Sequence, residues 1–216
     1  MAELTRPCLA NLGNVMKVFH APNTRSVRIV WLLEELGLPY ELEKFKLGDP
    51  AMRSPEYARV HPMGRVPALQ DGDTTIFESG AIVQYVLARH GKGRLVPDVS
   101  SPEFPQYLQW LHYAEGMIMP PVNVIVVETI LLPPERRNQV NVDRATKLLS
   151  RMLSAVDAHL DGREFLAGDF SGADIMTGHA CTVARRLGAD VSDKPNVAAY
   201  IDRLNARPAM QRAWAA

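Results

Sequence analysis

The sequence has no excess of either charge and no composition typical of a disordered chain. Its 216 residues carry 24 Lys plus Arg and 24 Asp plus Glu, so the formal net charge is zero, and 47% of the residues are hydrophobic. Proteins that bind nucleic acid usually present a basic surface, and disordered chains combine high net charge with low hydrophobicity. The sequence therefore predicts a globular protein with no nucleic-acid partner.

Cysteine and long apolar segments are also scarce. The two cysteines, Cys8 and Cys181, are far apart and form no CxxC motif, which excludes a disulfide scaffold and favours a reducing, cytoplasmic location. The most apolar stretch, residues 122–132, is much shorter than the ~20 residues that span a bilayer. Residues 1–15 lack the apolar segment of a secretory signal. We therefore expect no membrane partner and no signal peptide.

Motifs for metal and nucleotide chemistry are missing as well. The six histidines form neither an i, i+4 pair nor an HExxH motif, so no metal site is predicted. The sequence contains no phosphate-binding Walker loop, no complete dinucleotide fingerprint and no GxSxG motif. A function in this chain must depend on another kind of site.

The first half of the sequence alternates strands and helices. Residues 17–20 read as a strand, and residues 26–36 as a helix that Gly37 and Pro39 end. A second strand over 40–47, a hairpin over 68–77 and a helix from Ser79 to about residue 90 follow, with Ser79 as the expected N-cap. This order indicates an α/β domain over residues 16–95, preceded by an extension, residues 1–15, outside the fold.

The second half shows only helical patterns. A proline-rich linker over 96–104 precedes an all-helical domain over 105–216. Its expected helices cover 104–117, the stretch after Pro120 and Pro121, 141–160, 171–187 and 197–205. Ser171 and Asp174 have the spacing of a capping box, which is a folding device.

Two short elements of the first domain carry the site hypothesis. If the Val66–Pro67 bond is cis, the Val66 amide and carbonyl face outward together and offer a peptide an antiparallel backbone pair. Ser79, at a helix start, suits a carboxylate, and Glu78 suits an ammonium group. A ligand with an amine and a carboxylate at one end and a peptide backbone beyond them satisfies all three. The alternative is a trans edge proline, a surface charge and a simple N-cap.

The sequence resembles one known family along nearly its whole length. The segments APNTRSVRIVWLLEELG, HPMGRVPALQDGD and FESGAI resemble the first turn and helix, the Val-Pro loop and the Glu-Ser element of cytosolic glutathione S-transferases. FLAGDFSGAD and KPNVAAYIDRLNARPAMQRA resemble the capping segment and last helices of the same family. The resemblance is to bacterial and fungal types with Ser, Thr or Asn in the active-site turn. It implies a thioredoxin-like α/β N-terminal domain, an all-α C-terminal domain and a homodimer.

The resemblance also implies roles for particular residues. Val66, next to Pro67, would pair with the cysteinyl backbone of glutathione, Glu78 and Ser79 would hold its γ-glutamyl end, and Arg65 would reach its glycyl carboxylate. The family's electrophile pocket falls on Tyr113, Met117, Met119 and Val122, and soft Met side chains suit varied apolar ligands. Helical core is the alternative for each of these four.

The chemistry of the family needs a thiolate. A free thiol has a pKa near ~8.5, so the site must supply donors or positive potential at the sulfur. The turn over residues 21–26 contains neither Tyr nor Cys. Thr24 lies where the resembling sequences most often have serine; Asn23, Ser26 and the backbone amides are alternatives, and Ser26 is equally well a helix N-cap. Arg25 is either a catalytic neighbour, a solvated charge or an interdomain pair.

The resulting prediction is a cytoplasmic transferase of detoxification that conjugates glutathione to small apolar electrophiles, with no metal cofactor. A glutathione-dependent peroxidase, isomerase or dehalogenase uses the same thiolate. A glutathione-binding or interaction protein without turnover keeps the same fold. The sequence leaves the electrophile, the pathway and the dimer geometry open.

Overall fold

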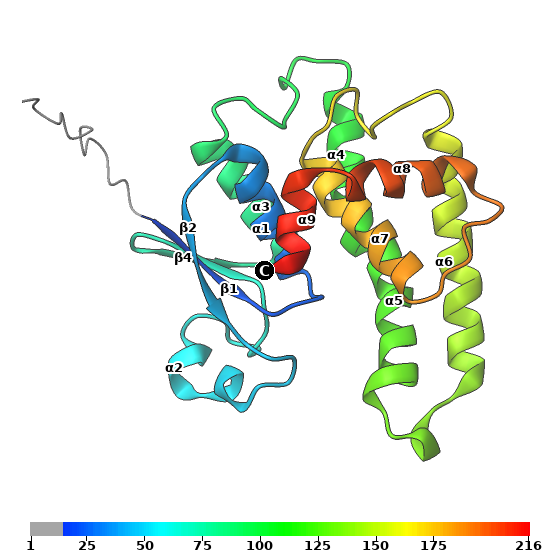
Figure 1. Cartoon of the computed structure of the whole chain (residues 1–216), viewed down its shortest axis with the longest axis horizontal. Coiled ribbons are helices and arrows are strands. Elements are labelled where there is room, and N and C mark those ends of the chain that lie inside the picture. The colour runs from blue at the N-terminus through cyan, green and yellow to red at the C-terminus, as the bar shows by residue number, and fades with distance from the viewer. Residues whose placement is uncertain (1–14) are drawn as a thin grey trace, which may run out of the picture.

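The first domain is built on a mixed four-stranded sheet. In the computed structural model, which describes residues 15–216, the strand order is β2 (Tyr40–Lys44), β1 (Met16–His20), β3 (Ala68–Asp71) and β4 (Thr74–Phe77). β1 pairs with β2 in parallel, and the other two pairs are antiparallel (Figure 1). The predicted extension, residues 1–15, lies outside the described residues except for Val15.

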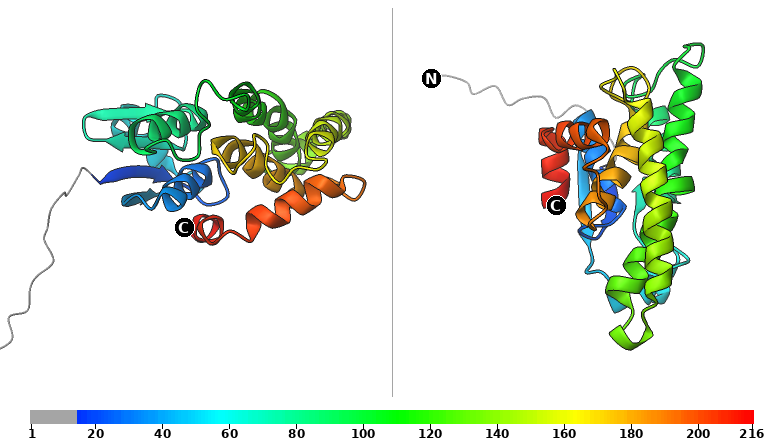
Figure 2. Two further views of the ribbon diagram at one scale, coloured as in Figure 1. Left: turned by 90° about the horizontal axis from the view of Figure 1, so that it is seen from above. Right: turned by 90° about the vertical axis from the view of Figure 1, so that its right-hand side faces the viewer.

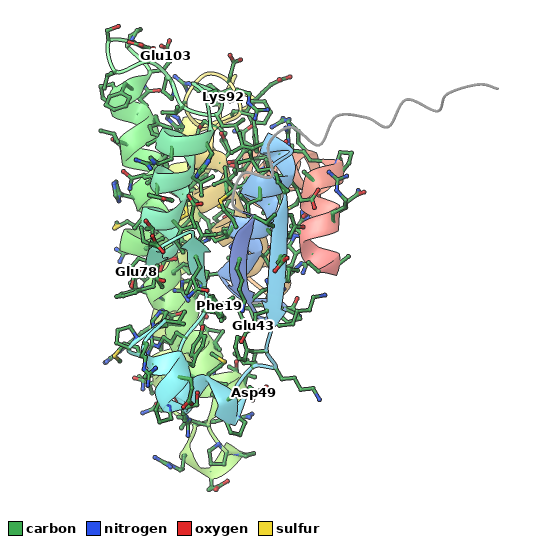
Figure 3. The ribbon with its side chains drawn as sticks, turned by 90° about the vertical axis from the view of Figure 1, so that its left-hand side faces the viewer. Phe19, Glu43, Asp49, Glu78, Lys92 and Glu103 are labelled. Atoms are coloured by element: carbon green, nitrogen blue, oxygen red, sulfur yellow. The ribbon has the colours of Figure 1, made fainter. Side chains whose placement is uncertain are left out.

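The two faces of the sheet bury different clusters, because successive side chains of a strand point to opposite faces. Val18 and Leu69 belong to the main core, on the side where α1 (Ser26–Leu36) and α3 (Ser79–His90) pack. Phe19 and Ala68 belong to a second cluster with residues of η1 (Pro50–Arg53) and α2 (Pro55–Ala58), two short elements that the sequence did not predict. Figure 3 labels Phe19 and its register partner Glu43 on β2.

The predicted ends of α1 and α3 agree with the structure, but the predicted caps do not. Gly37 ends α1 in the left-handed conformation, at φ 62°, which costs glycine little. Ser26 and Ser79 are the first residues inside their helices, and the N-cap positions belong to Arg25 and Glu78, neither of which caps with its side chain. Both serine hydroxyls make other contacts, described below, and this is why the capping interpretation was wrong.

The second domain is entirely helical, as predicted. Its first part is a continuous helical run made of α4 (Phe104–Tyr113), η2 (Ala114–Ile118), α5 (Met119–Val126) and η3 (Val127–Leu131). After η4 (Pro134–Arg136), the long α6 (Gln139–His159) returns alongside it (Figure 2). The chain ends with η5 (Asp174–Gly178), α7 (His179–Arg186), α8 (Pro195–Asn205) and α9 (Pro208–Ala215).

The helical run continues through Pro120 and Pro121, where the sequence predicted a break. η2 is a π-helical turn that ends at Ile118, and only Met119 separates it from Pro120. Prolines lack the N–H that an α-helix interior needs, and a wider turn accommodates them without ending the helix. By length and composition alone the joined run, Phe104–Leu131, would reach across a membrane, although 39% of its most apolar stretch is buried inside the protein. The run therefore exceeds the length expected from the sequence.

The two domains share one hydrophobic core. Trp31 of α1 is fully buried and lies 5.6 Å from the ring of Phe170 in the helical domain. α9 packs along α1, where Arg207 donates to Glu35 at 2.6 and 2.8 Å. The capping box is confirmed: the Ser171 amide donates to the Asp174 carboxylate at 2.8 Å, and the Ser171 hydroxyl accepts from the Ala173 amide at 3.3 Å.

Candidate active site

The sheet register brings three sequence elements to one edge. Phe19 of β1 pairs with Ala68 of β3, and Ala68 pairs with Phe77 of β4. The turn after His20 follows β1, the Val66–Pro67 loop precedes β3, and Glu78 follows β4. These elements are far apart in the sequence, and the ends of their strands place them side by side.

The Val-Pro loop has the conformation that the site hypothesis required. The Val66–Pro67 bond is cis, and within residues 15–216 the Val66 amide and carbonyl have no hydrogen-bond partner. Tyr57 holds the loop by donating to the Arg65 carbonyl at 2.7 Å. Gly64 has φ 58°, and a Cβ there would collide with the Met52 carbonyl, so only glycine fits. The exposed Arg65 side chain forms no ion pair among the described residues.

Glu78 and Ser79 begin α3 in an unusual geometry. Glu78 is exposed and has φ 72° and ψ 112°, a conformation that costs a non-glycine residue roughly 1–3 kcal/mol and is typical of functional sites. Figure 3 labels this side chain. Ser79 is 2% exposed, and its hydroxyl accepts a hydrogen bond from Arg28 at 2.9 Å. The first helical N–H bond of α3 is donated by Ile82, so the amides before it remain free for an anion.

The hydroxyls of Thr24 and Ser26 are occupied inside the turn. The Ser26 hydroxyl lies 2.8 Å from His20 Nδ1 and from the Thr24 hydroxyl, and it accepts from the Ala21 amide at 3.1 Å. His20 Nε2 is buried without a partner, which favours the tautomer with the proton on Nδ1, donating to Ser26. Burial, followed by the nearby Lys44, lowers the pKa of His20 to about 4, so the ring is neutral.

A count of donors and lone pairs then fixes the Thr24 hydroxyl. Ser26 accepts twice, from His20 and Ala21, so its own proton goes either to the Thr24 hydroxyl at 2.8 Å or to the Ala21 carbonyl at 3.1 Å. In both arrangements Thr24 accepts from the Ser26 amide at 3.3 Å and donates its own proton to the Ala21 carbonyl at 2.8 Å. Ser26 is fully buried. Neither hydroxyl has a proton left for a ligand.

Asn23 differs from both neighbours. It is exposed, adopts φ 60°, and its side chain forms no hydrogen bond with any described residue. Asn tolerates this left-handed conformation better than most residues. The backbone amides of Thr24 and Arg25, in front of α1, also lack acceptors within residues 15–216. The free donors of the turn are therefore an amide side chain and two backbone N–H groups.

A buried ionic network joins this edge to the helical domain. The fully buried Arg28 contacts Glu115 of η2 through Nη1 and donates from Nε to His179 Nδ1 at 3.1 Å. Arg25 holds the same Glu115 carboxylate at 2.8 and 3.0 Å and reaches Asn123 at 3.3 Å, so it is an interdomain ion pair. Burial acts to raise the pKa of Glu115, but the two arginines hold it below its usual value.

The four residues expected in the electrophile pocket lie in different surroundings. Met119 and Val122 are buried in the helical core, and the Tyr113 hydroxyl donates to the Met152 carbonyl of α6 at 3.1 Å. Only Met117 is exposed, at 42%. A groove of about 630 Å³ lies further along the same run, between it and α6, and is lined by Pro120, Pro121, Asn123, Val124, Val127, Glu128, Asn141, Arg144, Ala145 and Leu148. Among the described residues, no cluster of His, Cys, Asp or Glu fits a metal ion.

Comparisons with known proteins agree with this geometry. Residues 14–88 match the glutathione S-transferase N-terminal domain, and residues 119–208 match the C-terminal domain. Glutathione S-transferase 4 of Zea mays is 37% identical over 190 residues, covering 86% of this chain and 85% of its own. The chain belongs to the glutathione S-transferase family. The thioredoxin-like and all-helical domains that the sequence predicted are confirmed.

Solved structures of glutathione transferases have the same fold. One from Burkholderia graminis, with two glutathione molecules bound per subunit, is 28% identical with a TM-score of 0.84, covering 95% of this chain and 90% of its own. Another, from Phanerochaete chrysosporium in complex with oxidised glutathione, is 27% identical with a TM-score of 0.84, covering 95% and 96%. Similar proteins thus bind glutathione on this fold.

Four site residues were missed by sequence reasoning: His20, Arg28, Glu115 and His179. Arg28 had a signal, because it is a charged residue inside the otherwise apolar helix SVRIVWLL. Glu115 and His179 had none, since each becomes part of the site only when the helical domain packs against α1.

Proposed function

We propose that this glutathione S-transferase family member binds glutathione along the edge formed by the Val66 loop and the start of α3. The free backbone groups of Val66 would pair with the cysteinyl unit, and Glu78 and Ser79 would hold the γ-glutamyl amine and carboxylate. The exposed Arg65 side chain suits the glycyl carboxylate. The supporting neighbours are enzymes whose structures contain glutathione or its disulfide.

The observation that carries the catalytic proposal is the hydrogen-bond count in the turn. A thiolate beside this turn can be stabilised by the Asn23 side-chain amide and the N–H groups of Thr24 and Arg25, none of which has an acceptor among residues 15–216. The hydroxyls of Thr24 and Ser26 are satisfied internally. We therefore assign sulfur activation to Asn23 and the two backbone amides, in place of the Thr24 hydroxyl.

We place the second substrate, a small apolar electrophile, against the exposed side of the helical run. Asn123 both contacts Arg25 and lines the groove, so the groove opens beside the active-site turn. Met117, Val124 and Val127 expose apolar surface on this run, at 42%, 39% and 40%. Flexible Met and aliphatic surfaces suit electrophiles of varied shape.

We propose that the protein acts in the cytoplasm as a homodimer. Ile130, Leu131 and Val140 are 56%, 58% and 54% exposed at the far end of the helical hairpin. An apolar surface of this kind favours association. Sedimentation at micromolar concentration tests it, and a stable species of the single-chain mass, 24.0 kDa, would argue against a dimer.

A turnover screen tests the reaction. Purified protein with glutathione is offered aryl halides, epoxides, isothiocyanates and hydroperoxides. Conjugation of one of the first three supports a transferase, whereas turnover of hydroperoxides alone supports a peroxidase. If calorimetry shows that glutathione binds but no compound is turned over, the protein is a glutathione-binding protein without this activity.

A further inference from the structure

Ser79 has a buried hydroxyl whose hydrogen has no acceptor among the described residues. The residue is 2% exposed, and its oxygen accepts from Arg28 Nη1 at 2.9 Å. No acceptor for the Ser79 proton exists among residues 15–216. Because buried polar groups normally find partners, this proton indicates an acceptor that the protein alone does not supply.

The Arg28 contact decides what the Ser79 hydroxyl can do. A hydroxyl with one lone pair engaged by a guanidinium cannot turn its proton toward that group. The proton is therefore directed away from Arg28. The amides before Ile82, at the same end of α3, have no backbone acceptor among the described residues, so an anion bound at this end can accept from them as well as from the hydroxyl.

The orientation of Arg28 is itself fixed from the helical domain. Its Nη1 contacts the Glu115 carboxylate, and its Nε donates to His179 Nδ1 at 3.1 Å. The His179 ring is stacked on Trp214, with centroids 5.3 Å apart and an interplanar angle of 12°. Burial and the neighbouring Arg28 hold the pKa of His179 well below its usual value, so His179 accepts as a neutral ring.

Within the cluster formed by Arg25, Arg28, Glu115 and His179 the charges do not cancel. Arg25 and Arg28 are cations, Glu115 is the anion between them, and His179 is neutral, so this cluster has one more positive than negative charge. Excess buried charge is costly unless a partner compensates it. A carboxylate at Ser79 would supply that compensation.

We propose that Arg28 is a positioning residue for the ligand carboxylate. Arg28 orients the Ser79 hydroxyl as a donor and supplies the excess positive charge. Because Glu115 and His179 hold Arg28 in place, both effects depend on the helical domain. This inference rests on the proposed binding of glutathione, whose γ-glutamyl end has the α-carboxylate that the arrangement fits.

The test compares glutathione with 4-aminobutanoyl-Cys-Gly, which is glutathione without that carboxylate. Calorimetry with the wild type should show about ten- to hundredfold weaker binding of the analogue, the range for one hydrogen bond to a charged group. Arg28→Lys keeps the charge but cannot contact Ser79, Glu115 and His179 from one planar group. It should weaken glutathione about tenfold and change the analogue less than about twofold.

A matched control is Arg207→Lys, because Arg207 also joins the two domains but contacts Glu35, near the C-terminal end of α1, and makes no hydrogen bond or ion pair with Ser79, Glu115 or His179. This variant should keep the wild-type preference for glutathione. Equal weakening of both ligands in Arg28→Lys would show a purely structural role and overturn the inference. Unchanged binding of both would overturn it as well.

Ser79→Ala tests the same chain of contacts with Arg28 in place, which matters if Arg28→Lys does not fold. Ser79→Ala should bind glutathione more weakly and the analogue as tightly as the wild type. The double variant with Arg28→Lys should bind glutathione only slightly more weakly than either single variant, since both substitutions act on one interaction. Wild-type binding of both ligands by Ser79→Ala would refute the inference. A wild type that binds no glutathione would refute the proposed function, whereas equal binding of the two ligands by the wild type would refute only the role of Arg28.

Discussion

Replacing Asn23 with glycine separates the side-chain amide from the rest of the turn. Glycine accepts φ 60° without strain, so Asn23→Gly removes only the amide. Losing one hydrogen bond to a charged group costs ~1.5–3 kcal/mol, and one pKa unit corresponds to ~1.4 kcal/mol. The pKa of the bound glutathione thiol should therefore rise by about one to two units. Turnover at neutral pH should fall about ten- to hundredfold and recover as the pH is raised.

The matched variant is Thr24→Val, which keeps the shape and removes the hydroxyl. It removes the hydrogen bonds that the Thr24 hydroxyl makes with the Ala21 carbonyl, the Ser26 hydroxyl and the Ser26 amide, so the free energy of unfolding should fall by about 1–3 kcal/mol while the bound thiol pKa stays unchanged. Ultraviolet absorbance of the thiolate, titrated with glutathione bound, measures the pKa in each protein. A titration curve of Asn23→Gly that overlays the wild type, with Thr24→Val displaced upward, would refute the hydrogen-bond count and return activation to the Thr24 hydroxyl.

Three further outcomes are expected. Gly64→Ala forces a Cβ against the Met52 carbonyl at positive φ, so thermal denaturation should show a loss of about 1–3 kcal/mol and glutathione should bind more weakly; a wild-type melting curve would contradict this. The pKa of His20 is lowered to about 4 in the folded protein, so the unfolded state takes up the proton first, and the free energy of unfolding should decrease as pH falls from 6.5 to about 4. His20→Asn keeps a donor and does not ionise, so urea titrations of that variant should lack this contribution, and equal pH dependence in both would exclude His20 as the source. Burial raises the pKa of Cys181 to about 12, so a Cys8→Ser protein should release no chromophore from Ellman's reagent until denaturant is added, whereas rapid labelling of the folded variant would show that the thiol is accessible.

Local signals were enough to predict most of the fold. Gly37 after an apolar run of helical length placed the end of α1, and the turn at Asp71–Asp73 placed the hairpin, because these signals act over a few residues. The continuous helix through Pro120 could not be predicted in this way. Proline normally ends a helix, and here the outcome depends on a widened turn, η2, together with packing against α6.

The backbone arrangement of the proposed site could be predicted from the sequence, but the choice of its thiol-activating donor could not. Val66, Glu78 and Ser79 occupy strand and helix ends, and the pairing of strands brings such ends together. The choice between Thr24 and Asn23 could not be made from residue types, because a hydroxyl and an amide can both donate to a thiolate, and Thr24 was preferred only for its place in the resemblance. It depends on where His20 and Ser26 direct their hydrogen bonds, and that is a property of the folded turn.

The position of α1 has a consequence for how the two domains behave. The helix packs on β1 and α3 on one side and on α9 on the other, and one hydrophobic cluster extends from Met16 to Ala213. Moving the two domains apart would expose Trp31 and its neighbours to water. The domains should therefore melt as a single cooperative unit, and neither domain is expected to fold when it is expressed alone.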